Sequence, residues 1–241
     1  MQSIAVIGLS CLFPEANTPA EYWQNLLQGK NTCTSATESN LEAEPSRFFA
    51  DKKGVADKFY CARGGYIRDF SLDAEGFLLP AETIEKLGET FQWPLHVARE
   101  ALRDSGYADQ AEILKKCGVV LGNLSFPTKA SNHLLLPLYQ NVLDPLLKKA
   151  LNRSDFSLNS FTDEKNYAPE NSRISGLPAS IIAQALGLSA HSLALDAACA
   201  SSLYAVALAC HYLQSGKTDL MLAGAVSRSE ERRVGKECRS R

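Results

Sequence analysis

The sequence predicts an α/β fold in which a parallel or mixed sheet is covered by helices on both faces. Short apolar runs alternate along the chain with longer segments whose apolar residues recur at helical spacing, a pattern typical of strands joined by helical crossovers. With 241 residues, of which 45% are apolar, the chain can bury a sizeable core. Its length suits one large domain or two small ones.

Four apolar runs are the candidate strands. They are short and rich in branched or small apolar side chains, which favours strands that are buried on both faces. They lie at residues 4–7, 117–121, 192–197 and 220–226. Glycine follows the first two runs directly, at Gly8 and Gly122, so we expect tight turns there.

The candidate helices are marked by caps and by apolar spacing. They lie at residues 18–29, 89–104, 134–151, 174–186 and 200–213. In the first helix, Thr18 and Glu21 fit a capping box. Residues 30–79, with a turn at Gly64-Gly65, and 152–172 are expected to be irregular. Since proline removes a backbone donor, we expect the later helices to begin, kink or break at their internal prolines: Pro94, Pro137, Pro145 and Pro178.

Composition and charge argue against several functions. The formal charge is −2, so the basic excess of a nucleic-acid-binding surface is missing. The seven cysteines are scattered and no pair has CxxC spacing, which supports neither a zinc site nor a disulfide framework. No stretch of about 18 apolar residues and no signal peptide is present. We therefore expect a cytoplasmic protein with no membrane segment and no bound metal.

The segment that points to chemistry is LDAACASSL at residues 195–203. An apolar strand runs into a cluster of very small residues, a cysteine and then a helix. Such a sharp strand-to-helix turn exposes its central residue, and small neighbours let backbone and substrate approach closely. The first turn of a helix adds partial positive charge, which favours thiolate over thiol and can hold a developing oxyanion. Cys199 is therefore a candidate nucleophile.

A structural interpretation competes with this one, because free cysteine usually behaves as a small buried hydrophobe. For Cys199 the local pattern alone leaves both interpretations open. We assign the structural role to the cysteines that lack such a turn: Cys11, Cys33, Cys61, Cys117 and Cys210.

Four stretches of the chain are similar to one family, and they occur in that family's order. They are IAVIGLSCLFP at 4–14, AEYWQNLLQG at 20–29, WPLHVAREALRDSG at 93–106, and DAACASSL at 196–203 followed by DLMLAG at 219–224. Together they resemble the N-terminal half of a β-ketoacyl synthase (ketosynthase) domain of the type found in polyketide and polyunsaturated-fatty-acid synthases.

The resemblance implies a thiolase-like fold made of two duplicated α/β halves, of which residues 1–227 form the first. It implies that Cys199 takes an acyl group from a thioester carrier. The intact domain would then decarboxylate a malonyl thioester held on the phosphopantetheine of acyl carrier protein and join the two by Claisen condensation, without a bound cofactor. The intact domain is also expected to be a homodimer.

The chain departs from the family in its histidines. The family stabilises the carbanion equivalent with two histidines of its second half. Four histidines of this chain match neither motif and are expected to be structural or at the surface: His96, His133, His191 and His211. We therefore carry over Cys199 alone as catalytic, with its own backbone N–H as one half of an oxyanion hole. The chain by itself is expected to be inactive.

Three alternatives stay open. A thiolase of the same fold forms or cleaves β-ketoacyl thioesters without decarboxylation, but the opening that ends in Phe13-Pro14 and the long loop at 123–172 favour the synthase. A catalytically silent partner of a ketosynthase, which shapes chain length, usually lacks the nucleophile, so Cys199 argues against it. The third is a fragment that misfolds and has no function.

The last fourteen residues differ in character from the rest. Residues 228–241 read RSEERRVGKECRSR, with nine charges and no apolar face. A charge run is usually a solvated tail, but this peptide resembles the translation of a sequencing-library adapter. We therefore expect 228–241 to be a non-native tail.

Overall fold

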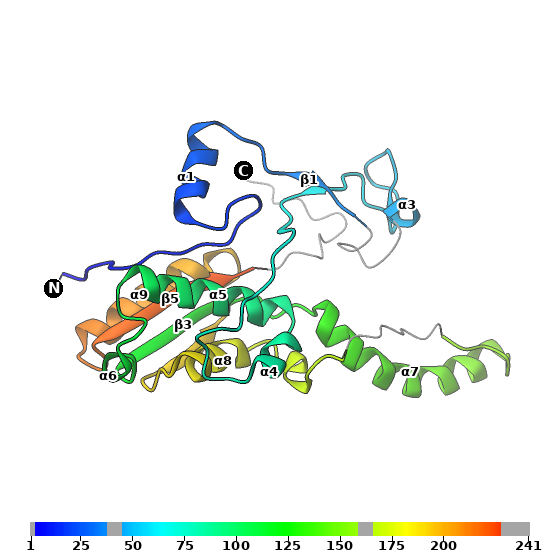
Figure 1. The fold of residues 1–241 in the computed structure, drawn as a ribbon. Helices are drawn as coiled ribbons and strands as arrows, with labels where there is room; N and C mark the ends of the chain where they lie inside the picture. Colours follow the sequence, from blue (N-terminus) through cyan, green and yellow to red (C-terminus); the bar gives the residue numbers. More distant parts are fainter. Residues whose placement is uncertain (1–2, 38–44, 159–165, 228–241) are drawn as a thin grey trace. The chain divides into compact units, whose positions relative to one another are not determined.

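The computed structural model describes residues 3–37, 45–158 and 166–227 (Figure 1). The chain divides into two compact units, one that includes Leu72–Ser227 and one that includes Val6–Ser71. The expected tail at 228–241 lies outside the described residues, as does part of the expected loop at 152–172.

The larger unit is built on a three-stranded parallel sheet. Its strands are β3 (Cys117–Asn123), β4 (Ser192–Leu195) and β5 (Leu220–Val226), in the spatial order β4-β3-β5. Val119 in β3 is in register with Ser192 of β4. As the middle strand, β3 is buried along its whole length, which its unbroken apolar run predicts.

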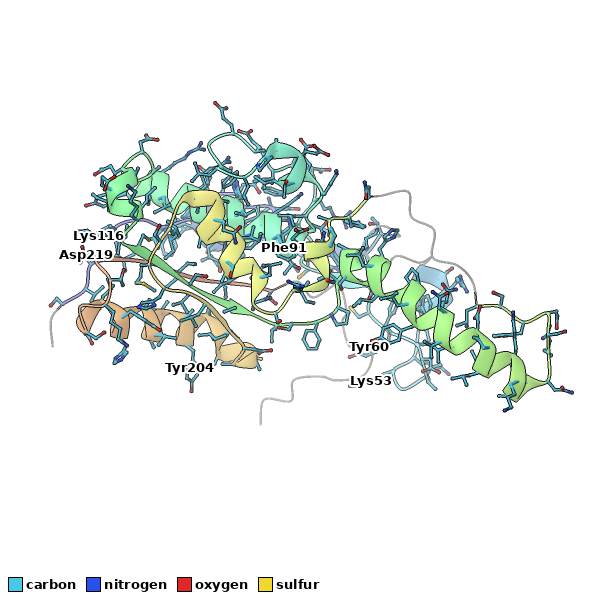
Figure 2. The ribbon with its side chains drawn as sticks, turned by 90° about the horizontal axis from the view of Figure 1, so that it is seen from below. Lys53, Tyr60, Phe91, Lys116, Tyr204 and Asp219 are labelled. Atoms are coloured by element: carbon cyan, nitrogen blue, oxygen red, sulfur yellow. The ribbon has the colours of Figure 1, made fainter. Side chains whose placement is uncertain are left out.

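Helices cover both faces of this sheet, which confirms the predicted α/β class. α5 (Glu89–Asp104) and α8 (Leu177–Leu186) lie on one face, and α9 (Ser201–Gln214) lies on the other (Figure 2). The connection from β3 leads to β4 on one side of it, and the connection from β4 leads back past β3 to β5 on the other side. Since parallel crossovers are right-handed, this reversal places their helices on opposite faces.

The hydrophobic core lies between the sheet and the α5–α8 layer. Its largest fully buried aliphatic and aromatic side chains include Phe91, Ile84, Leu95 and Ile182. Full burial of such a side chain stabilises by about 1.5–3 kcal/mol, so this cluster holds α5 and α8 on the sheet. This unit also contains the short helices α4 (Ala81–Glu85) and α6 (Ala111–Leu114) and the 3-10 helix η1 (Pro169–Ser172).

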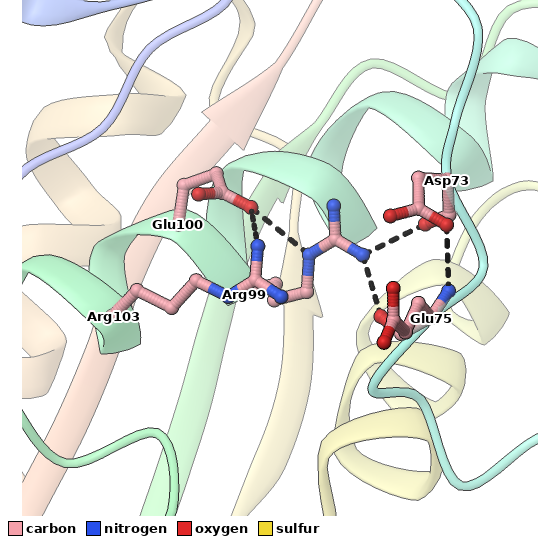
Figure 3. A network of polar contacts seen from close by, with 5 residues as sticks. All are labelled: Asp73, Glu75, Arg99, Glu100 and Arg103. Carbon is pink, nitrogen blue, oxygen red and sulfur yellow. Dashed lines mark hydrogen bonds and ion pairs between the residues drawn. The ribbon is translucent and has the colours of Figure 1, made fainter.

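A buried arginine fastens the loop before α4 to α5. Arg99 is 6% exposed, and its Nη1 donates to the backbone carbonyls of Asp73 and Glu75 at 2.7 Å each. Its Nε donates to Glu100 Oε1 at 2.9 Å, and the same oxygen accepts from Arg103 (Figure 3). The loop and the helix are therefore joined by a charged group that water barely reaches.

The expected strand at residues 4–7 is wrong. These residues have no regular secondary structure, and Ile4, Val6 and Ile7 are exposed, Val6 to 78%. An apolar run indicates a preference for burial, but a strand also needs a partner edge for its backbone hydrogen bonds. Among the described residues, β4 and β5 occupy both edges of β3, so this segment does not pair with the middle strand.

Contrary to our expectation, the prolines inside α5 and α7 (Lys129–Leu151) do not break these helices. α7 is one continuous helix with Pro137 and Pro145 inside it, and α5 contains Pro94 in the same way. Pro178 lies in the first turn of α8, where its missing N–H has no helical partner to lose. No helix of the described residues, α7 included, is both long enough and apolar enough to cross a membrane.

Several boundaries are confirmed and two strand ends are not. α5 and β5 begin and end where predicted, and Gly106 and Gly187 follow their helices with φ of +76° and +69°, the left-handed conformation that ends helices. β3, however, continues through Gly122 to Asn123, and β4 stops at Leu195, two residues earlier than expected.

The smaller unit confirms the capping box. α1 (Pro19–Leu27) starts after Thr18, whose hydroxyl accepts from Glu21 N at 3.2 Å while Glu21 Oε2 accepts from Thr18 N at 3.2 Å. A two-residue antiparallel pair joins β1 (Thr34–Ser35) to β2 (Arg63–Gly64), so Gly64 lies in a strand and the expected turn there is wrong. The remaining helix of this unit among the described residues is the short α3 (Pro45–Phe48).

Replacing Thr90 with valine is expected to raise the free energy of unfolding by about 1 kcal/mol. Thr90 is 5% exposed, and within the described residues its hydroxyl is the buried side-chain polar atom with no hydrogen-bond partner. Valine has nearly the same shape and removes this unpaired group. Urea denaturation followed by circular dichroism measures the change.

Thr128→Val is the matched control, because the Thr128 hydroxyl caps α7 and accepts from Ser131 N at 3.1 Å. We expect that variant to lose about 1 kcal/mol. Destabilisation by Thr90→Val as large as that of the control would show that the Thr90 hydroxyl is hydrogen-bonded in solution.

Candidate active site

The candidate nucleophile lies at the carboxyl edge of the parallel sheet. β4 ends at Leu195, the 3-10 turn η2 (Ala198–Ala200) follows, and α9 begins at Ser201. Cys199 is exposed at the centre of η2. In open parallel sheets, ligands bind beyond the carboxyl ends of the strands, where successive connections leave toward opposite faces. β3 and β4 flank such a point here.

Two side chains hold the turn around Ala198. Asp196 Oδ1 accepts from Ala198 N at 2.9 Å. Ser201 Oγ accepts from Ala197 N at 2.9 Å and donates to the Ala198 carbonyl at 2.8 Å. A main-chain bond from Ala200 N to the Ala197 carbonyl, at 3.1 Å, completes the turn. The peptide groups on either side of Ala198 are therefore both fixed by side chains.

Ala198 itself adopts the left-handed backbone conformation, with φ of +50°. A residue with a Cβ rarely does so, because Cβ crowds the next carbonyl at a cost of about 1–2 kcal/mol. The hydrogen bonds around Ala198 offset this cost. In the part of the chain that the structure describes, the N–H of the next residue, Cys199, donates to no other group.

β3 and α9 approach each other so closely that only glycine fits between them. A Cβ on Gly122 would lie 2.8 Å from the backbone carbon, the oxygen and the Cβ of Ser201. Along α9, the buried residues are all small and recur at every fourth position: Ser201, Ala205 and Ala209. The small residues that follow Cys199 therefore let the start of α9 rest against the middle strand.

The other described cysteines differ from Cys199 in position or in environment. Cys117 is buried in β3, and desolvation raises the pKa of its thiol to about 12, so it stays protonated at neutral pH. Burial, with a smaller effect of the Glu21 carboxylate, raises the pKa of Cys11. Cys210 is half-buried within α9. Two others are exposed in the smaller unit, so the buried role we expected for them is wrong: Cys33 and Cys61.

The four histidines are engaged in helices or with aromatic rings. His96 is half-buried in α5, and desolvation lowers its pKa. The rings of His133 and His191 lie 5.4 and 4.8 Å from tyrosine ring centroids, and His211 is exposed in the last turn of α9. In the described parts of the chain, no group of three or more His, Cys, Asp or Glu residues could hold a metal ion.

Sequence reasoning missed one polar residue at this edge of the sheet. Asn123 ends β3 and is 2% exposed, and its side-chain amide donates to the carbonyls of Ile174 and Ser175. It thereby fixes the segment before α8 beside the carboxyl ends of the strands. The available signal was a lone polar residue directly after the buried apolar run and Gly122.

The fold and the turn define a thiolase-like α/β protein of the ketosynthase class, and solved structures bear this out. The PfaC keto synthase–chain length factor is 47% identical over 94% of the chain, with a TM-score of 0.85. The ketosynthase from module 6 of the bacillaene synthase of Bacillus subtilis 168 is 25% identical over 93% of the chain, with a TM-score of 0.63.

The chain belongs to the β-ketoacyl synthase family, whose N-terminal domain matches residues 1–240. Among curated proteins, one of the polyunsaturated fatty acid synthase subunits of Thraustochytrium sp. is 30% identical over 92% of the chain. The chain spans only 8% of that relative, and 24% and 31% of the two solved chains. These matches confirm the family that the sequence motifs indicated.

Proposed function

We propose that this chain is the N-terminal half of a ketosynthase domain and that Cys199 accepts the growing acyl group. The observation that carries the proposal is the exposed Cys199 on a turn held at the carboxyl edge of the sheet, with its N–H unengaged among the described residues. An exposed thiol directly before a helix is accessible to a substrate, and the helix start favours negative charge beside it. A free N–H beside it can hold the oxyanion that forms on the acyl carbonyl.

The chemistry of such a domain divides condensation into two transfers. In the first, the Cys199 thiolate attacks the carbonyl of an acyl thioester, the bond from that carbonyl to the carrier sulfur breaks, and the carrier leaves as a thiol after taking up a proton. In the second, a malonyl thioester loses carbon dioxide, its α-carbon bonds to the acyl carbonyl, and the bond to Cys199 breaks. The products are carbon dioxide, a β-ketoacyl thioester and the free cysteine.

The substrates and partners belong to the same proposal. Acyl and malonyl groups would arrive on the phosphopantetheine of acyl carrier protein in the cytoplasm, and the intact domain would form a homodimer without a bound cofactor. The second transfer needs a stabiliser for the carbanion equivalent, whereas His133 and His191 lie beside tyrosine rings and His96 is half-buried in α5. We therefore infer that this chain alone can take an acyl group onto Cys199 but does not catalyse the condensation.

Incubation of the 241-residue chain with hexanoyl-N-acetylcysteamine thioester tests the first transfer. Peptide mass spectrometry is expected to find the hexanoyl adduct on Cys199, formed at least about ten times faster than on Cys210, because Cys199, unlike Cys210, combines an exposed thiol with a helix start. The adduct should disappear in Cys199→Ala and persist in Cys210→Ala. Equal rates at the two cysteines would remove the activated nucleophile.

A catalytically silent chain-length partner is the second candidate, because one similar solved structure combines a keto synthase with a chain length factor. The same adduct measurement separates the two. A silent partner needs no activated cysteine, so acylation of Cys199 no faster than that of Cys210 would favour it.

We also propose that 228–241 are foreign to the natural protein. Their composition, with nine charges in fourteen residues, supports this, whereas the family match at residues 1–240 extends over them. The nucleotide sequence over the last fourteen codons tests it: codons found in a continuous genomic read of the source would refute it.

A further inference from the structure

We propose that Asp196 and Ser201 are positioning residues that hold Ala198 in its left-handed conformation and so keep the N–H of Cys199 free to bind the acyl oxyanion. This inference rests on the proposed function of Cys199 as the acyl acceptor. It assigns separate tasks to three neighbouring residues: Cys199 reacts, and the other two fix the shape of the turn.

The Ser201 hydroxyl is the central part of this clamp. Ser201 is 5% exposed, and its single hydroxyl both accepts from Ala197 N at 2.9 Å and donates to the Ala198 carbonyl at 2.8 Å. Its backbone rests against Gly122 of β3, where a Cβ would not fit. The hydroxyl is therefore anchored to the sheet, and it fixes the peptide group before Ala197 and the one between Ala198 and Cys199.

Asp196 fixes the peptide group between these two, the one that joins Ala197 to Ala198. Its Oδ1 accepts from Ala198 N at 2.9 Å, which makes a local side-chain turn of the kind that aspartate favours. Asp196 is itself exposed, so its side chain contributes little packing. Removal of its carboxylate should therefore change the turn without unfolding the chain.

The left-handed Ala198 has a direct consequence for Cys199. If Ala198 and the two residues before it took the ordinary helical conformation, α9 would extend backwards by one turn. In a regular helix the N–H of residue 199 donates to the carbonyl of residue 195, which would consume the donor. The hydrogen bonds of Asp196 and Ser201 thus keep the Cys199 N–H available to a substrate instead of bonded to the chain's own backbone.

Two reagents with different demands test the clamp in the 241-residue chain. Acylation by hexanoyl-N-acetylcysteamine thioester passes through an oxyanion, whereas alkylation by iodoacetamide displaces iodide and forms none. We expect Asp196→Ala and Ser201→Ala to slow acylation of Cys199 at least about tenfold, as loss of an oxyanion donor does. Alkylation of Cys199 by iodoacetamide should change by less than about threefold, since thiol access is retained.

Two further variants serve as controls. Asp196→Asn keeps the accepting oxygen and should restore most of the acylation rate. Ser202→Ala removes the neighbouring exposed hydroxyl and should leave both rates unchanged. The alkylation rate of Cys210, within α9, reports whether each variant keeps its helix.

The outcomes separate this inference from the proposed function. If the wild-type chain acylates Cys199 no faster than Cys210, the proposed function and the clamp both fail. If the wild-type chain acylates Cys199 rapidly and the two alanine variants do so equally fast, only the clamp fails. A parallel fall of acylation and alkylation would also overturn it, because a general loss of structure slows both.

Discussion

Replacing Arg99 with methionine is expected to lower the free energy of unfolding by about 3 kcal/mol. Methionine keeps the unbranched aliphatic stem but loses three hydrogen bonds made by a guanidinium that is 6% exposed. It also loses the contact of that cation with the ring of Phe77, whose centroid lies 4.8 Å away. Hydrogen bonds to a charged group contribute about 1.5–3 kcal/mol each, partly offset by the guanidinium's desolvation.

Arg103→Met is the matched control for this prediction. Arg103 lies on the same helix and bonds the same Glu100 oxygen at 2.9 Å, but its side chain is 46% exposed. An exposed pair contributes less than about 1 kcal/mol, so urea denaturation should distinguish the two variants clearly. If Arg99→Met is as stable as the wild type or more stable, the desolvation free energy of the guanidinium equals or exceeds the stabilisation from its hydrogen bonds.

The parts of the fold that the sequence predicted correctly depend on local signals. The capping box of Thr18 and Glu21 forms because both partners lie within one turn. α5 carries an apolar stripe that includes Phe91 and Leu95, and its spacing alone predicts a helix. β5 is a short apolar run between a helix and a polar segment, and it forms where predicted.

The errors come from interactions that a local pattern does not contain. Residues 4–7 have the composition of a buried strand, but pairing is decided by distant segments, and β5 lies beside β3 instead. Pro137 and Pro145 each remove a backbone bond, yet α7 stays continuous from a capping box at Thr128 to a left-handed Asn152. In both cases the structure depends on residues outside the predicted element: on the strands that pair with β3 for residues 4–7, and on the caps of α7 for residues 134–151.

The sequence predicts the candidate nucleophile, but it does not predict the residues that hold the turn around it. Cys199 follows from small residues between a strand and a helix, which is a contiguous pattern. The roles of Asp196 and Ser201 depend on the left-handed Ala198, and no neighbouring residue indicates that conformation for an alanine. The role of Gly122 depends on a contact with Ser201, which is remote in sequence.

Gly122→Ala is expected to lower the free energy of unfolding by about 1–3 kcal/mol and to slow acylation of Cys199. The new Cβ would lie 2.8 Å from the backbone carbon and oxygen of Ser201. Backbone atoms of a helix cannot move singly, so the first turn of α9 must shift away from β3. That shift displaces the Ser201 hydroxyl from the Ala197 N–H and the Ala198 carbonyl to which it bonds.

Gly224→Ala in β5 is the matched control, because Gly224 is also a strand glycine and a Cβ there meets no atom within 4 Å. Alanine loses less conformational entropy on folding than glycine, so this variant should be neutral or slightly stabilised. Denaturation curves and acylation rates of the two variants, measured side by side, isolate the effect of the close approach. If Gly122→Ala matches Gly224→Ala in both measurements, then β3 and α9 have room for a methyl group, and the clamp around Cys199 does not depend on the strand beneath it.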